Sequence, residues 1–355
     1  MAGSMSEPPR HRPMVSAVIA CYNEAGNVRE MHRRLTAVLA GLPVRYELLF
    51  VENGSTDATS SLLNELAGVD PHVKVIVLSR NFGSQSAFSC GLEYAQGDCA
   101  VLLDGDLQDP PELLPQLIER WQSGYDVVYG ERAQRDAPWF LRLGYKAFYR
   151  LFSRMSYVHM PVDAGDFGLI DRRVIDVLNA MPENRRFLRG LRAWAGFRQC
   201  GVPYRRAARY SGRSSNSLFA LFRWASDGIV SFSYAPLQLI SLLAAVVIVL
   251  TGIALLVYLI VYFVRPGAPS GFETILVAVL FLGSVQLLCL SILGMYVARI
   301  FEEVKRRPRY LVDRVVGGEV TGERGKGGED GSVAGPGVGP VGELTMEPSR
   351  GRDRA

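Results

Sequence analysis

The chain has 355 residues, of which 48% are hydrophobic and 21% are charged. This length favours two domains or one large domain with additional segments, and the composition excludes collagen, a disulfide scaffold and a wholly disordered chain. The mean hydropathy is slightly positive, which is high for a purely soluble enzyme and predicts membrane segments. The net charge is only +4, so a basic site has to come from local clustering.

The cysteines and histidines indicate neither a disulfide framework nor a zinc site. The five cysteines form no C-x-x-C pair, which is typical of reduced thiols in the cytosol, and the four histidines have no metal-ligand spacing. Residues 1–13 are polar and proline-rich and contain no apolar core of a signal peptide. We therefore expect the N-terminal domain to stay in the cytoplasm.

Short apolar runs alternate with amphipathic stretches between residues 14 and 130. The predicted strands are 15–20, 46–51, 73–78, 99–104 and 125–130, and the predicted helices include 24–40, 57–67, 84–96 and 111–122. Strands that are apolar almost throughout, alternating with helices, predict an α/β domain with a parallel sheet covered on both faces. Ligands of such sheets bind at the carboxyl ends of the strands.

Two later segments are rich in arginine. Residues 138–158 mix aromatic and basic side chains at helical spacing, which predicts a membrane-surface helix or a packed helix with a solvated basic face. Ten arginines and no carboxylate lie between Glu183 and Asp227, which favours binding of phosphates, from lipid headgroups or from a phosphorylated substrate. No nucleic-acid-binding signature accompanies them, so we expect no nucleic-acid partner.

Residues 235–264 and 274–298 contain no charged side chain. A bilayer core needs about 20 apolar residues per helix, so both segments are predicted to span a membrane. Basic residues flank the pair on its outer sides, and the positive-inside rule therefore places both outer ends in the cytosol. Glycine-rich residues 317–355 are expected to be a disordered tail.

A D-x-D pair, Asp104 and Asp106, follows the fourth predicted strand. Two such carboxylates can address one cation and its bound diphosphate, and oxygen ligands suit Mg²⁺ or Mn²⁺; a solvated loop with a helix cap is the alternative. The turns after the first two strands are rich in Asn, Glu, Ser and Asp, which taken singly suit ordinary turns and caps. Because the three strand ends meet at one edge, we expect a crevice for a nucleotide.

Several motifs together resemble the polyprenyl-phosphate branch of the family 2 glycosyltransferases, over roughly residues 14–312. The motifs are YNE (22–24), GSTD (54–57), RNFGSQSAFSCGL (80–92), LDGDLQDPPE (103–112), VDAGDFGLIDRRV (162–174), RFLRGL (186–191) and the C-terminal helix pair. The resemblance implies a GT-A (Rossmann-like) fold, a nucleotide-sugar donor, Mg²⁺ or Mn²⁺, a polyprenyl phosphate acceptor and inversion at the anomeric carbon. Related enzymes assemble as tetramers, which suggests a homo-oligomer.

The resemblance also assigns roles to residues of this chain. The catalytic residues are Asp166, near the reacting sugar, and the D-x-D carboxylates Asp104 and Asp106. The metal ligands are Asp104, Asp106 and Gln108, with Asp106 as the direct ligand. The donor nucleotide is assigned to Glu24, Glu52, Asp57 and Asp104, and the acceptor phosphate to Arg209, Ser211, Arg213 and Ser214.

Four positions, in three motifs, depart from the family pattern. Glu52-Asn53 stands where the family usually has two aspartates, which leaves the base preference open. Gly168 stands where a basic residue is frequent, and Ser215 replaces a lysine for which Arg213 is the candidate substitute.

A lipid phosphate acceptor makes a general base unnecessary. The second pKa of a phosphate monoester is about 6, so the acceptor is largely a dianion and already nucleophilic at neutral pH. The cation would neutralise the leaving diphosphate, and the arginines would neutralise the acceptor or bind anionic lipid. For Asp166 we favour orientation of the sugar or stabilisation of positive charge over base catalysis or a purely structural hydrogen bond.

The favoured function is a membrane-anchored, inverting transfer of a hexose to a polyprenyl phosphate at the inner (plasma) membrane, with both termini cytosolic. UDP-glucose is the first candidate donor, and a GDP-linked mannose or a modified sugar stays open. A processive polysaccharide synthase is disfavoured because a Q-x-x-R-W motif is absent. A non-catalytic membrane adaptor with a degenerate GT-A domain is the other alternative.

The expected division of the chain follows from these segments. It comprises a disordered N-terminus (1–13), a GT-A catalytic domain with juxtamembrane helices at about 138–158 and 185–196 (14–228), two transmembrane helices (229–301), a basic cytosolic segment (302–316) and the tail (317–355).

Overall fold

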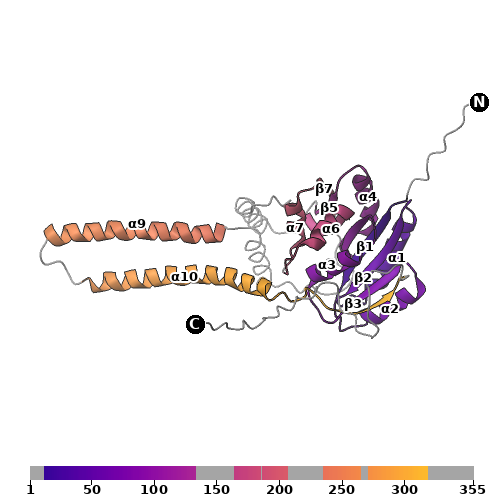
Figure 1. The fold of residues 1–355 in the computed structure, drawn as a ribbon, viewed down its shortest axis with the longest axis horizontal. Coiled ribbons are helices and arrows are strands. Elements are labelled where there is room, and N and C mark those ends of the chain that lie inside the picture. Colours follow the sequence, from indigo (N-terminus) through magenta and orange to yellow (C-terminus); the bar gives the residue numbers. More distant parts are fainter. Residues whose placement is uncertain (1–11, 133–163, 185, 207–234, 265–270, 319–355) are drawn as a thin grey trace, which may run out of the picture. The chain divides into compact units, whose positions relative to one another are not determined.

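The computed structural model describes residues 12–132, 164–184, 186–206, 235–264 and 271–318 (Figure 1). Residues 12–206 of this part form a domain around a β-sheet. Residues 235–304 contribute two long helices, and the last strand of the sheet comes after them. The predicted amphipathic helix at 138–158 lies outside the described residues.

The sheet of the described residues has eight strands in the order β7-β5-β6-β4-β1-β2-β3-β8. Their bounds are β1 (Met14–Cys21), β2 (Arg45–Glu52), β3 (Val73–Leu78), β4 (Cys99–Asp104), β5 (Val127–Arg132), β6 (Ala164–Asp171), β7 (Gln199–Tyr204) and β8 (Val312–Gly317). The first five strands lie within two residues of the predicted runs. Their nearly continuous burial, as in β4, where only the final aspartate is partly exposed, is the reason that the apolar runs identified them.

The predicted parallel pairing is confirmed for the central strands β1 to β4, but the complete sheet is mixed. Strand β1 pairs in parallel with β2 and β4, and β2 with β3. Strand β6, however, is antiparallel to both β4 and β5 and separates them, and β8 is antiparallel to β3. Both antiparallel strands come from chain segments beyond the regular strand-helix alternation, so the alternation contained no information about their direction.

Helices cover the two faces of the sheet and form two apolar clusters. The helices are α1 (Val28–Ala40), α2 (Thr59–Val69), α3 (Ser84–Tyr94), the 3₁₀ turn η1 (Pro111–Leu113), α4 (Leu114–Gln122), α6 (Arg172–Ala180) and α7 (Leu188–Ala195). Helices α1, α2 and α4 contribute to one cluster, and α3, α6 and α7 to the other. Both faces of the central strands are therefore buried, which explains why their sequences do not alternate between apolar and polar residues.

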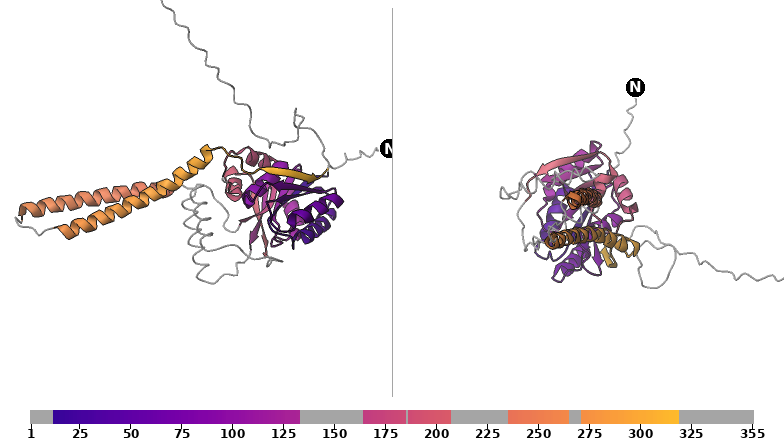
Figure 2. Two further views of the ribbon diagram at one scale, coloured as in Figure 1. Left: turned by 90° about the horizontal axis from the view of Figure 1, so that it is seen from below. Right: turned by 90° about the vertical axis from the view of Figure 1, so that its left-hand side faces the viewer.

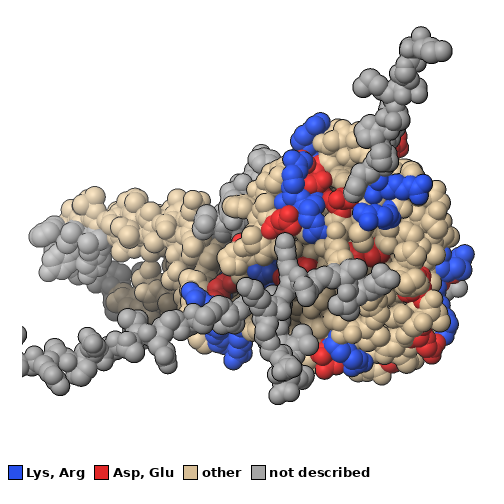
Figure 3. All heavy atoms as spheres, turned by 45° about the vertical axis from the view of Figure 1, so that its right-hand side comes forward, with Lys and Arg blue, Asp and Glu red and all other residues tan. Residues whose placement is uncertain are grey.

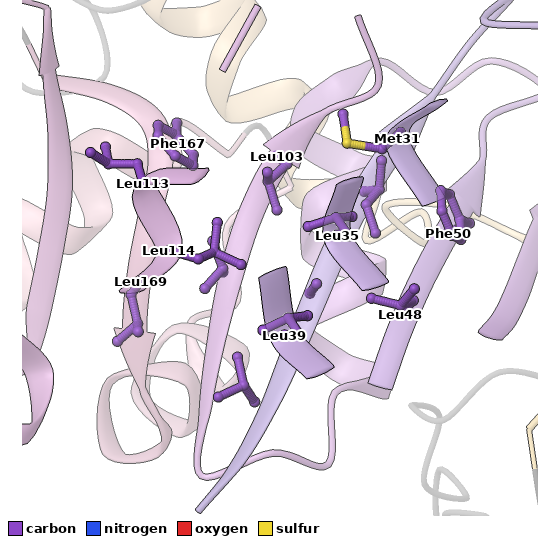
Figure 4. Packing of buried hydrophobic residues seen from close by; sticks show 14 of the residues in the cluster. Met31, Leu35, Leu39, Leu48, Phe50, Leu103, Leu113, Leu114, Phe167 and Leu169 are labelled. Atoms are coloured by element: carbon purple, nitrogen blue, oxygen red, sulfur yellow. The ribbon is translucent and has the colours of Figure 1, made fainter. Parts of the chain in front are cut away.

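Helix α1 shows how one face of a helix enters this core. Met31, Leu35 and Leu39 recur at four-residue spacing and are fully buried, as an amphipathic helix requires. They lie over Leu48 and Phe50 of β2 (Figure 4). This packing holds α1, and with it the turn that precedes it, in a fixed place at the carboxyl end of β1.

The two long helices are α9 (Ala235–Val264) and α10 (Phe272–Val304). Both are candidate membrane spans by length and composition, and their apolar windows, Leu237–Ala254 and Phe281–Val304, are not buried inside the protein. In Figure 3 these helices are largely free of charged side chains, whereas blue and red side chains are spread over the sheet domain. Helix α9 has the limits of the first predicted span, and α10 continues six residues beyond the second.

The segment over 302–316, expected from the sequence to be basic and cytosolic, includes most of an additional strand. Residues 312–317 form β8, which pairs with β3 along the edge of the sheet (Figure 2). Just before β8, Arg309 contacts Glu93 of α3 at 3.4 Å, and the hydroxyl of Tyr310 donates a hydrogen bond to the same carboxylate. The chain therefore leaves the sheet domain, forms the two apolar helices and returns to complete the domain's edge.

Candidate functional site

The D-x-D turn is built at the end of β4 and is held against the end of β1. Asp104 is the last residue of the strand, and the amide of Gly105 donates to the carbonyl of Ala20 at 3.0 Å. The side chain of Asp106 accepts a hydrogen bond from the amide of Gln108 at 3.1 Å. Leu107 lies between them with a φ of 59°, in the left-handed region that few residues with side chains adopt. The structure therefore folds the predicted metal ligands into one tight turn.

Negative charge accumulates around Asp104. Burial, followed by the carboxylates of Asp109, Asp166 and Asp106, raises the pKa of Asp104 to about 7, against a smaller opposing effect of Arg206. In such surroundings the ionised form of the carboxylate is unfavourable by itself, and a bound cation would stabilise it. Within the described residues, no group of three or more His, Cys, Asp or Glu side chains could hold a metal ion. The turn contains the carboxylates of Asp104 and Asp106, and the other ligands of a bound cation would come from Gln108, phosphates or water.

The turns after β1 and β2 are tied to each other by short polar side chains. Asp57 accepts hydrogen bonds from the amide of Ala25 at 3.2 Å and from the amide and hydroxyl of Thr59 at 3.0 and 2.5 Å. Burial alone would raise the pKa of Asp57, but the hydrogen bonds from Thr59 and Ala25 outweigh it and lower the value. The same hydroxyl of Thr59 accepts from the amide of Glu24 at 2.8 Å. Asp57 and Glu24 are thus brought together as predicted, and Asp57 binds the two turns to each other.

Glu52 is the last residue of β2 and Asn53 follows it, at the same edge of the sheet as the end of β1. Glu52 is buried, and one of its carboxylate oxygens accepts from the amide of Ser55 at 2.5 Å. Between them, Gly54 has a φ of 69°, and a Cβ there would lie 2.5 Å from the backbone of Arg80. The glycine is therefore required both by its backbone conformation and by the close approach of the segment that follows β3.

The departure at Asn53 has a structural reason. Its amide oxygen accepts from the backbone amide of Phe82 at 2.9 Å, and its amide nitrogen donates to the side-chain oxygen of Asn81 at 3.2 Å. That oxygen also accepts from the amide of Gly83 at 2.8 Å, which determines the orientation of both amides. An aspartate could not donate to Asn81. Asn53 therefore holds the segment 81–83, and its presence does not by itself indicate a degenerate donor site.

Asp166 lies on β6 in a partly buried position with a strong cationic partner. The two carboxylate oxygens accept from Nε and Nη2 of Arg189, each at 3.1 Å, and Oδ2 also accepts from Nε2 of Gln85 at 3.1 Å. The side chain is 13% exposed. Burial opposes ionisation, but Arg189 dominates together with Arg192 and Gln85, so the pKa of Asp166 is lowered. An ionised carboxylate with a depressed pKa is a poor proton acceptor, which favours an orienting or electrostatic role.

The sequence did not identify three residues, Gln85, Arg189 and Arg192, that bind Asp166 through its side chain or its backbone. Arg189 and Gln85 lie in motifs that the resemblance identified, but nothing in the motifs said that both side chains bind Asp166. Arg192 is 3% exposed and donates to the backbone oxygens of Gly165 and Asp166; burial lowers its pKa to about 10. The spacing of Arg189 and Arg192 by three residues places them on one face of a helix, which was the available signal.

A second missed contact lies next to the D-x-D turn. Asp109 is 2% exposed, accepts a hydrogen bond from the hydroxyl of Tyr204 and lies 3.5 Å from Arg206. The end of β7 is thereby joined to the loop after β4. The loop that contains Arg209, Ser211, Arg213 and Ser214 follows directly in the chain and lies outside the described residues, as does Ser215.

The arginine-rich segment is partly structural, which corrects its interpretation as a phosphate-binding surface throughout. Arg186 is buried and donates to the backbone oxygens of Leu178 and Met181, while Arg189 and Arg192 bind around Asp166. Helix α7 buries Leu188 and Leu191 in the core, although Trp194 is 57% exposed. These three arginines bind a carboxylate or backbone carbonyls from other elements, which a count of acidic residues within the segment could not reveal.

Comparison with known proteins places these residues in a wider group. The family model described as Glycosyl transferase family 2 matches residues 16–178. The chain is 40% identical to the uncharacterized glycosyltransferase sll0501 of Synechocystis sp., over 85% of this chain and 96% of that protein. It is 40% identical to the uncharacterized glycosyltransferase YkcC of Bacillus subtilis, over 85% and 94% of the two chains.

A third relative has a name that specifies an acceptor. The SfII prophage-derived bactoprenol glucosyl transferase of Shigella flexneri is 36% identical over 305 residues, which cover 84% of this chain and 97% of that protein. A match of that length within 355 residues has to include parts of both long helices as well as the sheet domain.

Proposed function

Because the chain belongs to glycosyl transferase family 2, we propose that it transfers a hexose from a nucleotide sugar, UDP-glucose first, to a polyprenyl phosphate with inversion at the anomeric carbon. The observation that carries the proposal is the similarity along most of the chain to a protein named as a bactoprenol glucosyl transferase. The paired carboxylates at the end of β4 and the two candidate membrane spans support it. Transfer from a nucleotide sugar requires a donor site, and a lipid acceptor requires that the enzyme reach a membrane.

The donor lies, in this proposal, across the carboxyl ends of β1, β2 and β4. Glu24, Glu52 and Asp57 border the nucleoside, and the D-x-D turn borders the diphosphate. Asp104 and Asp106, with Gln108 beside them, would hold Mg²⁺ or Mn²⁺, because the raised pKa of Asp104 indicates negative charge that the protein compensates only in part. When bound, such an ion neutralises charge on the leaving diphosphate.

The acceptor is a phosphate dianion that needs no base. Arg209, Ser211, Arg213 and Ser214 are the residues we assign to it. Asp166 is then free for another role: its lowered pKa keeps it ionised, so it stabilises positive charge that develops at the anomeric carbon or orients the sugar hydroxyls. The transfer forms a bond from phosphate oxygen to the anomeric carbon and breaks the bond from that carbon to the diphosphate.

The two apolar helices would anchor the enzyme in the inner (plasma) membrane. With both outer ends of the pair in the cytosol, the sheet domain and the returning strand β8 lie on the same side as the nucleotide sugars. The pairing of β8 with β3 supports this arrangement, because residues before α9 and after α10 belong to one sheet and have to share a compartment.

Transfer in membranes or detergent tests the proposal. Purified protein is given undecaprenyl phosphate, Mg²⁺ or Mn²⁺ and labelled UDP- and GDP-sugars one at a time, with EDTA and Asp106→Ala as controls. We expect one lipid-extractable product, formed from UDP-glucose and abolished by both controls. A product from another donor would correct the sugar, and folded protein that binds a donor but transfers nothing would favour the adaptor.

A further inference from the structure

Gln85 joins three elements of the candidate site, and we propose that it is a positioning residue that holds the Asp166 carboxylate for transfer. It is the second residue of α3. Its Nε2 donates to Oδ2 of Asp166 at 3.1 Å, and its Oε1 accepts from the backbone amide of Leu188, the first residue of α7, at 2.8 Å. This inference rests on the proposed function, because it adds a residue to the machinery of the same reaction.

The two hydrogen bonds determine which way the amide of Gln85 faces. The amide of Leu188 can only donate, so the atom opposite it has to be the oxygen, and the nitrogen has to face Asp166. Since Asp166 is ionised and can only accept, both ends of Gln85 are matched to their partners. A carboxylate at position 85 would satisfy Leu188 but would face Asp166 with a second acceptor.

Gln85 is also connected to the donor side of the site. It follows Gly83, which has a φ of 89°, and the backbone of residues 82 and 83 is bound by Asn53 and Asn81. Asn53 itself continues from Glu52 at the end of β2. A short path of hydrogen bonds and covalent backbone therefore runs from the expected nucleoside side to the carboxylate expected at the reacting sugar.

The surroundings of Asp166 explain why a neutral donor is placed there. Arg189 supplies positive charge through two hydrogen bonds, Arg192 binds the backbone oxygen of Asp166, and repulsion by Asp166 is one cause of the raised pKa of Asp104. Arg189 belongs to α7, and Gln85 ties the first amide of that helix to α3. Gln85 therefore restrains both the carboxylate and the helix that carries its cationic partner.

The variant Gln85→Glu converts this contact into a titratable one. A protonated glutamic acid donates to Asp166 and accepts from Leu188 as glutamine does, whereas an ionised one repels Asp166. Proximity to Asp166 raises the pKa of the new side chain above the ordinary value of about 4.3. We expect kcat at pH 8 to fall by about 10- to 100-fold, with recovery toward the wild-type value as the pH is lowered to 5.5, and a donor KM that changes little.

Two further variants separate positioning from other causes of loss. Gln85→Met keeps the length of the side chain but cannot donate, and we expect a similar loss of kcat at every pH. Gln116→Glu adds the same charge on the exposed surface of α4 and is expected to match the wild type. A Gln85→Glu profile parallel to that of the wild type, or a loss that falls on donor KM alone, would overturn the proposal.

Thermal unfolding provides a readout that does not need turnover. If the carboxyl group introduced by Gln85→Glu faces Asp166, its pKa is raised in the folded protein, so the variant is most stable at low pH and loses stability as the pH rises. The difference in unfolding temperature between Gln85→Glu and the wild type should therefore widen from pH 5.5 to pH 8. A wild-type enzyme inactive with every donor would count against the proposed function, whereas a constant difference in unfolding temperature would count against the Gln85 contact.

Discussion

Asp104 at the end of β4 and Asp166 on β6 are both largely withdrawn from water, yet the protein destabilises the charge of the first and stabilises the charge of the second. Burial and the neighbouring carboxylates Asp109, Asp166 and Asp106 raise the pKa of Asp104 to about 7. At Asp166, burial is outweighed by Arg189, and the pKa is lowered. Among the described residues, the β6 side thus has a strong counter-charge in Arg189, whereas on the β4 side only Arg206 lowers the pKa of Asp104. In the proposed reaction, a cation that arrives with the substrate would therefore be needed only on the β4 side.

Removing charge from the β4 side should have the largest effect. We expect Asp106→Asn to lower kcat by about 10³-fold, since deleting one electrostatic group in an active site commonly costs about 10²- to 10³-fold. The measurement is transfer to undecaprenyl phosphate at saturating Mn²⁺. Asp176→Asn, at an exposed position on α6, is the matched control and should keep its activity. An Asp106→Asn enzyme that retains more than about a tenth of the activity would contradict the assignment.

Removing the counter-charge on the β6 side should reduce stability. Arg189→Met leaves an ionised carboxylate without its cation, and we expect a loss of ~2 kcal/mol in the free energy of unfolding, below the value for a fully buried pair because both side chains are partly exposed. Chemical denaturation in detergent measures this loss. Because the folded pKa of Asp166 is lowered, the stabilisation is present at neutral pH and is lost as the pH falls through the range below about 4.

A double variant tests whether that loss belongs to the pair. Arg189→Met combined with Asp166→Asn should recover part of the stability, since no charge then remains unpaired. If the double variant is as unstable as the sum of the single ones, Arg189 stabilises the domain by packing and the two regions do not differ in the way described.

The Asp104 side should show the opposite dependence on pH. Its raised pKa means that, without metal, the contribution of Asp104 to stability is greatest below its unfolded pKa of about 4 and is lost as the pH rises through about 7. Unfolding temperatures of metal-free protein should therefore decrease between pH 5 and pH 8, and Asp104→Asn should reduce that slope. Titration with Mn²⁺ should show affinity rising about tenfold per pH unit up to that pKa and then levelling. An affinity independent of pH would argue against Asp104 as a ligand.

The smallest effect is expected at Asn53, which follows β2 and is separated from β4 by β1 in the strand order. Asn53→Asp loses the hydrogen bond to Asn81 or forces Asn81 to turn away from Gly83, and we expect a destabilisation of ~1 kcal/mol. Thermal unfolding measures it, and binding of UDP and GDP to the same variant serves as the second measurement. A stability equal to that of the wild type combined with a changed nucleotide preference would mean that Asn53 contacts the base.

The sequence alone predicted the central strands, the D-x-D turn at the end of β4 and the two apolar helices. These features are local, because continuous burial and helical periodicity are visible within ten or twenty residues. The family resemblance added the importance of Asp166 and of the motifs around Gln85 and Arg189. The loop with Arg209 and Arg213 lies outside the described residues, so its assignment to the acceptor phosphate is still a prediction from the family resemblance.

Only the tertiary structure decided how these pieces meet. Gln85 and Asp166 are 81 positions apart, and Glu93 and Tyr310 are 217 apart, so no periodicity relates them. The insertion of β6 between β4 and β5 brings Asp166 toward the D-x-D turn, and the return of β8 after two apolar helices closes the edge at β3. Sequence patterns report which residues are buried, whereas the topology determines which buried charge faces which partner and hence its protonation.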